Sequence, residues 1–147
     1  MRFKESINRK VVSLANAESI GKVSHFVVDV PEHKISALKL RKTDDKHRAF
    51  LVWGSVSGFG DDAVTVADAA VLVDGDETLE KDADKHHQLI GKLALSTLGD
   101  ELGVVSDVEF DPATGVLLRI QHTHGSTHGD GLVGIGSYAA VLEVTAD

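Results

Sequence analysis

The chain repeats part of its own sequence, and this repeat limits the folds that it can adopt. Residues 10–29 align without a gap with residues 92–111 when the chain is shifted by 82 positions. The identical pairs in this register are Lys10 and Lys92, Gly21 and Gly103, Val23 and Val105, Ser24 and Ser106, and Asp29 and Asp111. Further on, residues 58–60 align with residues 134–136 at a shift of 76. Several matches in one register favour a duplication, so we expect two copies of one small fold.

Each copy has the pattern of short β-strands separated by turns. Polar and apolar residues alternate over residues 23–29 and again over 35–41, as they do in half-buried strands. The sequence Asp111-Pro112-Ala113-Thr114-Gly115 is typical of a turn, because Asp bonds the following backbone, Pro fixes φ and Gly tolerates positive φ. Gly21 and Gly103 are expected at tight turns. The other expected strands are 49–53, 63–66 and 116–121, with 132–135 and 139–144 as counterparts of the first two.

An acidic, polar stretch separates the two copies. It spans residues 74–85 and is predicted to be a linker that contains at most a short helix. We therefore expect an all-β chain with one barrel over residues 1–74, a linker over 75–85 and a second barrel over 86–147. Domains of about 65 residues are close to the lower size limit for independent stability, so the two barrels should pack together. The aliphatic residues expected to fill the seam are Val71, Leu72, Val73, Leu79, Leu89 and Ile90.

Charge and composition exclude several classes of protein. The chain has no cysteine, and no apolar run reaches the length of a membrane span. No leader-like segment is visible at the N-terminus, which predicts a cytoplasmic protein. Residues 1–75 hold 11 Lys and Arg against 10 Asp and Glu, whereas residues 76–147 hold 4 against 13. The acidic second half disfavours DNA and RNA as partners, because binding to phosphates requires cations.

The turn and strand motifs resemble one known family. The pattern Gly103-x-Val105-x-Asp107-Val108-x-Phe110-Asp111-Pro112-x-Thr114-Gly115-x-Leu117 is similar to the signature region of PRC-barrel domains, and residues 56–66 are similar to that family's closing strand. The first copy differs at Pro31-Glu32-His33, and the second differs at Tyr138-Ala139. The resemblance implies two tandem small PRC-type β-barrels joined by a short acidic linker.

The same resemblance implies a binding or assembly role. The family includes the reaction-centre H subunit, the C-terminal half of a bacterial ribosome-maturation factor and stand-alone proteins that resemble cell-division adaptors. We therefore expect a non-catalytic adaptor that binds a protein partner or a second copy of itself as a homodimer. The alternative from the maturation factor is an RNA- or ribosome-associated module, which the net charge of −8 disfavours.

Catalytic motifs are absent from the sequence. The chain contains no Gly-x-Ser-x-Gly motif, and its glycine-rich stretch at 53–60 precedes no expected helix. Since no acid, base and nucleophile converge in the pattern, we expect no enzymatic activity and no cofactor.

A cluster of histidines provides the third functional hypothesis. His122, His124 and His128 lie within seven residues, a spacing that could bring imidazoles together around Zn²⁺ or Ni²⁺. The surrounding Gly, Ser and Thr residues favour a mobile hairpin loop instead, and no residue that would orient the imidazoles is evident. We therefore expect no metal site there.

Basic and aromatic residues in the first copy form the candidate partner surface. Lys39 and Arg41 fall on one face of an expected strand, and Arg48 follows closely. Phe50 and Trp53 are the aromatic candidates, with burial in the core as the alternative for both. The sequence therefore assigns partner binding to Lys39, Arg41, Arg48, Phe50 and Trp53.

Overall fold

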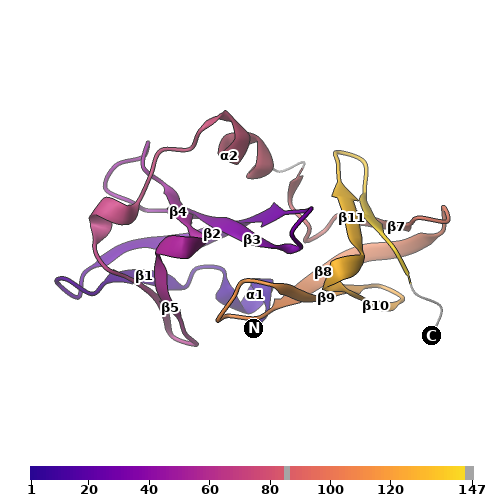
Figure 1. Cartoon of the computed structure of the whole chain (residues 1–147), viewed down its shortest axis with the longest axis horizontal. Helices are drawn as coiled ribbons and strands as arrows, with labels where there is room; N and C mark the ends of the chain where they lie inside the picture. The colour runs from indigo at the N-terminus through magenta and orange to yellow at the C-terminus, as the bar shows by residue number, and fades with distance from the viewer. Residues whose placement is uncertain (85–86, 145–147) are drawn as a thin grey trace.

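The computed structural model describes residues 1–84 and 87–144, and it is mostly β. Figure 1 shows two halves side by side along the long axis of the molecule, with the N-terminus beside the second half. Each half contains one six-stranded sheet. The predicted all-β fold with two small barrel-like halves is confirmed.

The first half begins with the short helix α1 and ends with the short helix α2. Its sheet has the strand order β4-β3-β2-β1-β6-β5. The elements are α1 (Phe3–Ser6), β1 (Lys10–Ser13), β2 (Ser19–Asp29), β3 (Lys34–Arg41), β4 (Phe50–Val52), the 3₁₀ helix η1 (Trp53–Ser55), β5 (Val56–Phe59), β6 (Ala63–Val66), the 3₁₀ helix η2 (Ala69–Val71) and α2 (Glu77–Asp82). The long hairpin of β2 and β3 is where the sequence alternates most regularly.

The second half repeats this arrangement strand for strand. Its order, β10-β9-β8-β7-β12-β11, is that of the first sheet with every strand number raised by six. The elements are β7 (Leu93–Ser96), β8 (Glu101–Phe110), β9 (Leu117–His122), β10 (Gly125–His128), the 3₁₀ helix η4 (Gly129–Gly131), β11 (Leu132–Ile135) and β12 (Ala140–Leu142). The counterpart of β4 is therefore β10. The prediction that residues 132–135 take this role is wrong, because they form β11, the equivalent of β5.

The predicted gapless register holds in β8 and β9 but is wrong by one residue in β7. In the first half, Lys10 pairs with Lys22. Val104 is the equivalent of Lys22 in the second half, and it pairs with Leu93 rather than with Lys92. The cause is the turn before the second strand. In the first half, the backbone N–H of Ser13 donates to the carbonyl of Glu18, five residues on. In the second half, the N–H of Ser96 donates to the carbonyl of Asp100, four residues on, so the turn between β7 and β8 is one residue shorter than the turn between β1 and β2.

The two repeated glycines lie inside strands, so their assignment to tight turns is wrong. Gly21 pairs with Val11 in β2, and Gly103 pairs with Ala94 in β8. A side chain at Gly21 would lie 3.1 Å from the Thr43 methyl group, and one at Gly103 would overlap Thr123. Glycine is required at Gly103, where φ is +92° and Thr123 approaches the strand closely, whereas an added side chain at Gly21 would be crowded.

The two halves meet through equivalent residues of their long hairpins. Lys34 forms an antiparallel bridge with Val116, the residue that occupies the same position in the second repeat at a shift of 82. Two backbone hydrogen bonds flank this bridge, from Ile35 N to Gly115 O at 2.8 Å and from Leu117 N to His33 O at 2.9 Å. Ile35 and Leu117 are equivalent positions, and so are His33 and Gly115. The first bond therefore runs from the first half to the second, and the other is its counterpart from the second half to the first. This reciprocity defines a pseudo-twofold axis between the halves, as in an isologous dimer interface.

An aromatic cluster joins the two halves into one hydrophobic core. Phe3 of α1 stacks on Phe26 with ring centroids 4.0 Å apart, and both rings lie against Phe110 of β8. Phe59 contacts Phe110 edge-on at 5.3 Å. Buried residues of both halves belong to this single cluster, so the predicted packing of the barrels is confirmed.

The residues expected to fill the seam divide between two places. Leu72 and Leu89 are buried in the shared core, and Val71 and Ile90 pack against it. Val73 and Leu79 instead pack on a separate cluster within the first half. The prediction is therefore wrong for these two, because α2 turns back onto the first sheet. Within the described part of the chain, no helix has the length and apolarity needed to cross a membrane.

Candidate interaction surfaces

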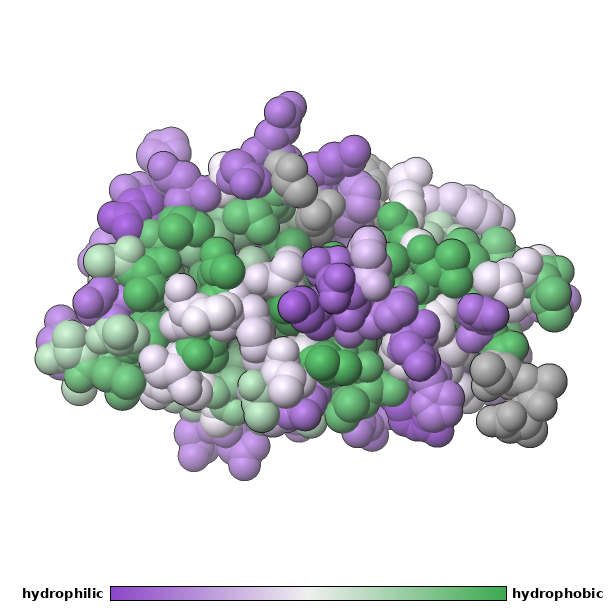
Figure 2. Space-filling view, in the orientation of Figure 1, coloured by the Kyte–Doolittle hydropathy of each residue, from purple (hydrophilic) through white to green (hydrophobic). Residues whose placement is uncertain are grey.

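The acidic segment after the first sheet covers the outer face of that sheet. Asp76 accepts a hydrogen bond from Leu79 N at 2.8 Å and thereby caps α2. Leu79 and Ala83, four residues apart, place their side chains on a small cluster that also contains Val27, Ala37 and Phe50. Figure 1 shows α2 over the β2–β3 hairpin, and Figure 2 shows hydrophilic side chains over this region. The segment expected to be a linker therefore also covers the first sheet.

Two of the five predicted partner-binding residues are packed inside the protein. Phe50 is 1% exposed because α2 and Val73 cover it, so its assignment to a partner surface is wrong. Trp53 is half-buried and stacks on Phe59 with ring centroids 5.6 Å apart. Its indole also closes over Gly115, where an added side chain would lie 2.9 Å from the ring. Trp53 therefore contributes to the contact between the halves.

The three basic candidates lie in or beside the two strands at the β4 edge of the first sheet, Lys39 and Arg41 in β3 and Arg48 just before β4. The Lys39 ammonium lies 5.7 Å from the centroid of the Phe50 ring, and Arg41 is exposed and bonds the Asn8 amide. The Arg48 guanidinium donates to the carbonyls of Leu72 at 2.6 Å and Ala70 at 3.0 Å. Arg48 thus ties η2 to the edge of the first sheet, whereas Lys39 and Arg41 remain candidates for a partner.

The same outer face is polar in the second half. The repeat register places Glu109, Arg119 and Ser126 where the first half has Val27, Ala37 and Phe50. Glu109 and Arg119 are half-buried, and Ser126 is exposed. Apolar residues therefore occur on the outer face that α2 covers, and polar residues replace them on the equivalent face of the second sheet.

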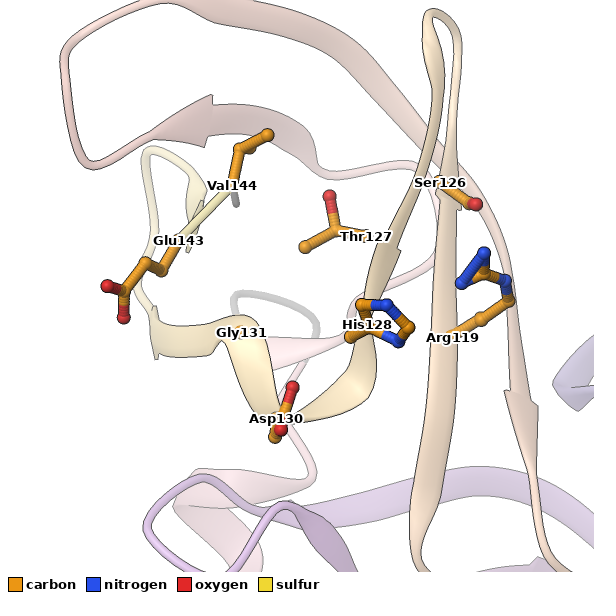
Figure 3. A pocket seen from close by; sticks show the side chains of 8 residues that line it. All are labelled: Arg119, Ser126, Thr127, His128, Asp130, Gly131, Glu143 and Val144. Carbon is orange, nitrogen blue, oxygen red and sulfur yellow. The ribbon is translucent and has the colours of Figure 1, made fainter. Parts of the chain in front are cut away.

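A groove of about 420 Å³ lies along β10 beside this polar face (Figure 3). Figure 3 shows Arg119 and Ser126 on one side of the β9–β10 hairpin and Thr127 on the other, toward Val144. The groove is lined by Arg119, Ser126, Thr127, His128, Asp130, Gly131, Glu143 and Val144. The Arg119 guanidinium forms no hydrogen bond or ion pair with any described residue, so a cation remains available at this edge.

Comparison with known families identifies the fold. The PRC-barrel domain family matches residues 1–79, more than half of the chain. The chain belongs to the PRC-barrel family. No curated protein is significantly similar to it. The match covers the first sheet, η2 and the start of α2, so the family assignment rests on the first half of this PRC-barrel protein.

His122 of this PRC-barrel protein is buried and links β9 to β10. Its Nε2 lies 3.1 Å from the Thr127 hydroxyl, and its Nδ1 is buried without a hydrogen-bond partner in the described part of the chain. Burial lowers the pKa of His122, the charge of His124 lowers it further, and the Leu102 backbone offsets only part of this effect. Since both side chains are buried, the pair links the two strands inside the second half.

The three candidate metal ligands occupy different environments. His122 is buried, whereas His124 lies exposed in the β9–β10 turn and His128 lies exposed on β10. Among the side chains that the structure describes, no three His, Asp or Glu residues form a group that could hold a metal ion. The stretch predicted to be a mobile loop instead contains β10, which pairs with β9 over four residues.

Two signals of these surfaces are present in the sequence but do not stand out in it. One is the spacing of Leu79 and Ala83, which places two apolar side chains on one face of an acidic helix. The other is the exchange of Phe50 for Ser126 between repeats, which becomes visible only when β10 is aligned with β4. The short strand Gly-Ser-Thr-His lacks the apolar alternation that would mark it as a strand.

Proposed function

We propose that this PRC-barrel protein is a non-catalytic assembly adaptor that binds a protein partner, and that its second half is a second PRC barrel. The family assignment of the first half and the repeated strand order support the second barrel. The single observation that carries the adaptor function is the shared core. It holds Lys39 and Arg41 of the first half and the β10 groove of the second on one body. A partner can thus contact both halves without having to order a flexible tether.

The test begins with crosslinking in the native cell, followed by reconstitution with purified proteins. We expect a specific protein to crosslink and then to bind the chain directly with fixed stoichiometry in calorimetry. The variant Lys39→Glu/Arg41→Glu should weaken this binding, whereas Lys10→Ala, an exposed control, should leave it unchanged. Sedimentation should be measured in parallel, because a second copy of the chain is also a protein partner.

Two results would contradict the adaptor function. One is the failure of every crosslinked protein to bind directly once purified, with the chain itself monomeric. The other is tight binding of RNA in anisotropy measurements with a steep salt dependence, which indicates contacts with phosphates. The second result would favour the RNA- or ribosome-associated alternative.

A further inference from the structure

The exposed edge of β10 carries an inference that rests on the proposed adaptor function and makes it specific. We propose that this edge binds an extended segment of the partner protein, which adds to the second sheet as one more strand. The segment carries an acidic residue opposite Ser126 and no second acidic residue directly beside it. The edge, the groove beside it and the charges around it each support one part of this proposal.

The first half shows how such a segment binds. Val73 pairs with Phe50 on the outer edge of β4, with Val73 N to Phe50 O at 2.9 Å and Phe50 N to Val73 O at 3.1 Å. The residue before it, Leu72, is 5% exposed and packs into the core. One extended residue with an apolar neighbour is therefore sufficient to cover this edge.

The equivalent edge of the second half has its backbone groups free. Ser126 pairs with Gln121, as Phe50 pairs with the equivalent Lys39, so its N–H and C=O also face away from the sheet. No backbone group of residues 1–84 or 87–144 bonds them. An unpaired edge is a template for an added strand, because its donors and acceptors are already aligned. The groove beside it provides room for side chains of that strand.

The charges around the edge determine which segment fits. In a sheet, the residue opposite Ser126 points to the outer face, where Arg119 lies between His128 on β10 and Glu109 on β8, its two cross-strand neighbours. An acidic side chain there reaches the unpaired Arg119 guanidinium, which binds carboxylates in a fork of two hydrogen bonds. The neighbouring residues point to the side of Thr127 and Val144 (Figure 3), and the groove there is also lined by Asp130 and Glu143, which disfavour a second acidic side chain.

Peptides based on the first half provide the probe. The reference peptide has the sequence of residues 68–73, Asp-Ala-Ala-Val-Leu-Val, followed by an alanine amide in place of Asp74, and two others carry Glu or Lys in place of the Val that corresponds to Val73. A fourth carries N-methylated Glu at that position, which removes the backbone donor. Binding to the full chain is measured by anisotropy, and amide shifts are followed by NMR.

We expect the Kd of the Glu peptide to be lower than that of the Lys peptide by a factor of about ten or more, because Glu forms charge-assisted hydrogen bonds with Arg119 and Lys does not. Its binding should shift the amides of residues 125–128 and protect the Ser126 amide from exchange. Arg119→Ala should remove the preference for Glu over Lys, whereas Lys10→Ala should preserve it. The N-methylated peptide should lose most of the affinity. Circular dichroism and thermal melting establish that each variant is folded.

Several outcomes would overturn the proposal. These are equal binding of the Glu and Lys peptides, full binding of the N-methylated peptide, amide shifts confined to other strands, and no binding at millimolar peptide. A Ser126 amide already protected in the free monomer would show that the chain's own residues cover the edge. Protection that grows with protein concentration would assign the edge to a second copy. A reconstituted partner that binds Arg119→Glu as well as wild type would refute this site and leave the adaptor function standing.

Discussion

Phe110 lies at the centre of the contact between the halves, so its truncation tests whether they share one core. Its side chain is fully buried, and its ring centroid lies 5.7 Å from that of Phe3 and 5.6 Å from that of Phe26. Truncation of a buried Phe to Ala costs about 3–5 kcal/mol, because burial is lost and a cavity remains. Since about 1 kcal/mol shifts Tm by about 2–4 °C in chains of similar size, we expect Phe110→Ala to lower Tm by about 6–20 °C.

Urea unfolding followed by two probes provides the assay. Trp53 lies 6.3 Å from Phe110, so its fluorescence reports on the seam, whereas far-ultraviolet circular dichroism reports on both sheets. We expect one coincident transition for both probes, because a continuous core couples the halves. Leu98→Ala is the control, since Leu98 is 86% exposed and its loss should change stability by less than about 0.5 kcal/mol. Two separated transitions, or a fragment 86–147 as stable as the full chain, would refute the shared core.

Two further predictions concern η4 and the buried imidazole. Gly129→Ala should lower the free energy of unfolding in urea by at least about 1–3 kcal/mol, because its Cβ would overlap the Leu117 carbonyl. Gly134→Ala should be nearly neutral, because the space around Gly134 is open. Equal effects of the two substitutions would contradict this explanation. The pKa of His122 is lowered by folding, so the unfolded chain binds more protons, and stability should fall as pH drops below about 6.5. His122→Gln should reduce this loss in thermal melts between pH 7 and 5, with His25, whose pKa is also lowered, retaining part of it; an unchanged slope would be the contrary result.

The repeat and the alternation of residues were sufficient to predict the main hairpins. A strand that is buried on one face must alternate, so the residues that form β2, β3 and most of β9 are recognisable from their side chains alone. The repeat then predicts that both halves share one topology, which the two strand orders confirm. The family resemblance adds the fold class, which the match to residues 1–79 supports. The domain bounds at residues 74 and 86 remain a prediction.

The candidate surfaces could not be predicted in the same way, because they depend on pairing between distant segments. The role of β10 as a strand follows from its hydrogen bonds to β9, since Gly125 and Ser126 are weak strand formers and the segment lacks apolar alternation. The burial of Phe50 depends on α2, whose acidic composition is also typical of a linker. The free edge at Ser126 becomes visible only by comparison with the bridge between Phe50 and Val73.

The outer face of the first sheet is apolar and is covered by α2, whereas the equivalent face of the second sheet is polar. The strength of the contact between α2 and the first sheet can be measured directly. Leu79 packs on the cluster that contains Phe50. Residues that share a cluster show coupling energies of about 0.5–3 kcal/mol in a double-mutant cycle. We therefore expect Leu79→Ala to destabilise the wild-type chain more than it destabilises Phe50→Ala, by an amount in that range.

The matched control for this cycle combines Leu79→Ala with Leu98→Ala, an exposed residue of the other half. These two substitutions should be additive within about 0.5 kcal/mol, because distant sites without shared partners act independently. Hydrogen exchange provides a second readout, since Phe50→Ala should increase exchange at the last amides of α2 and leave those of β8 unchanged. If Leu79 and Phe50 were additive as well, α2 would not be held by this cluster, and the apolar face of the first sheet would need another cover.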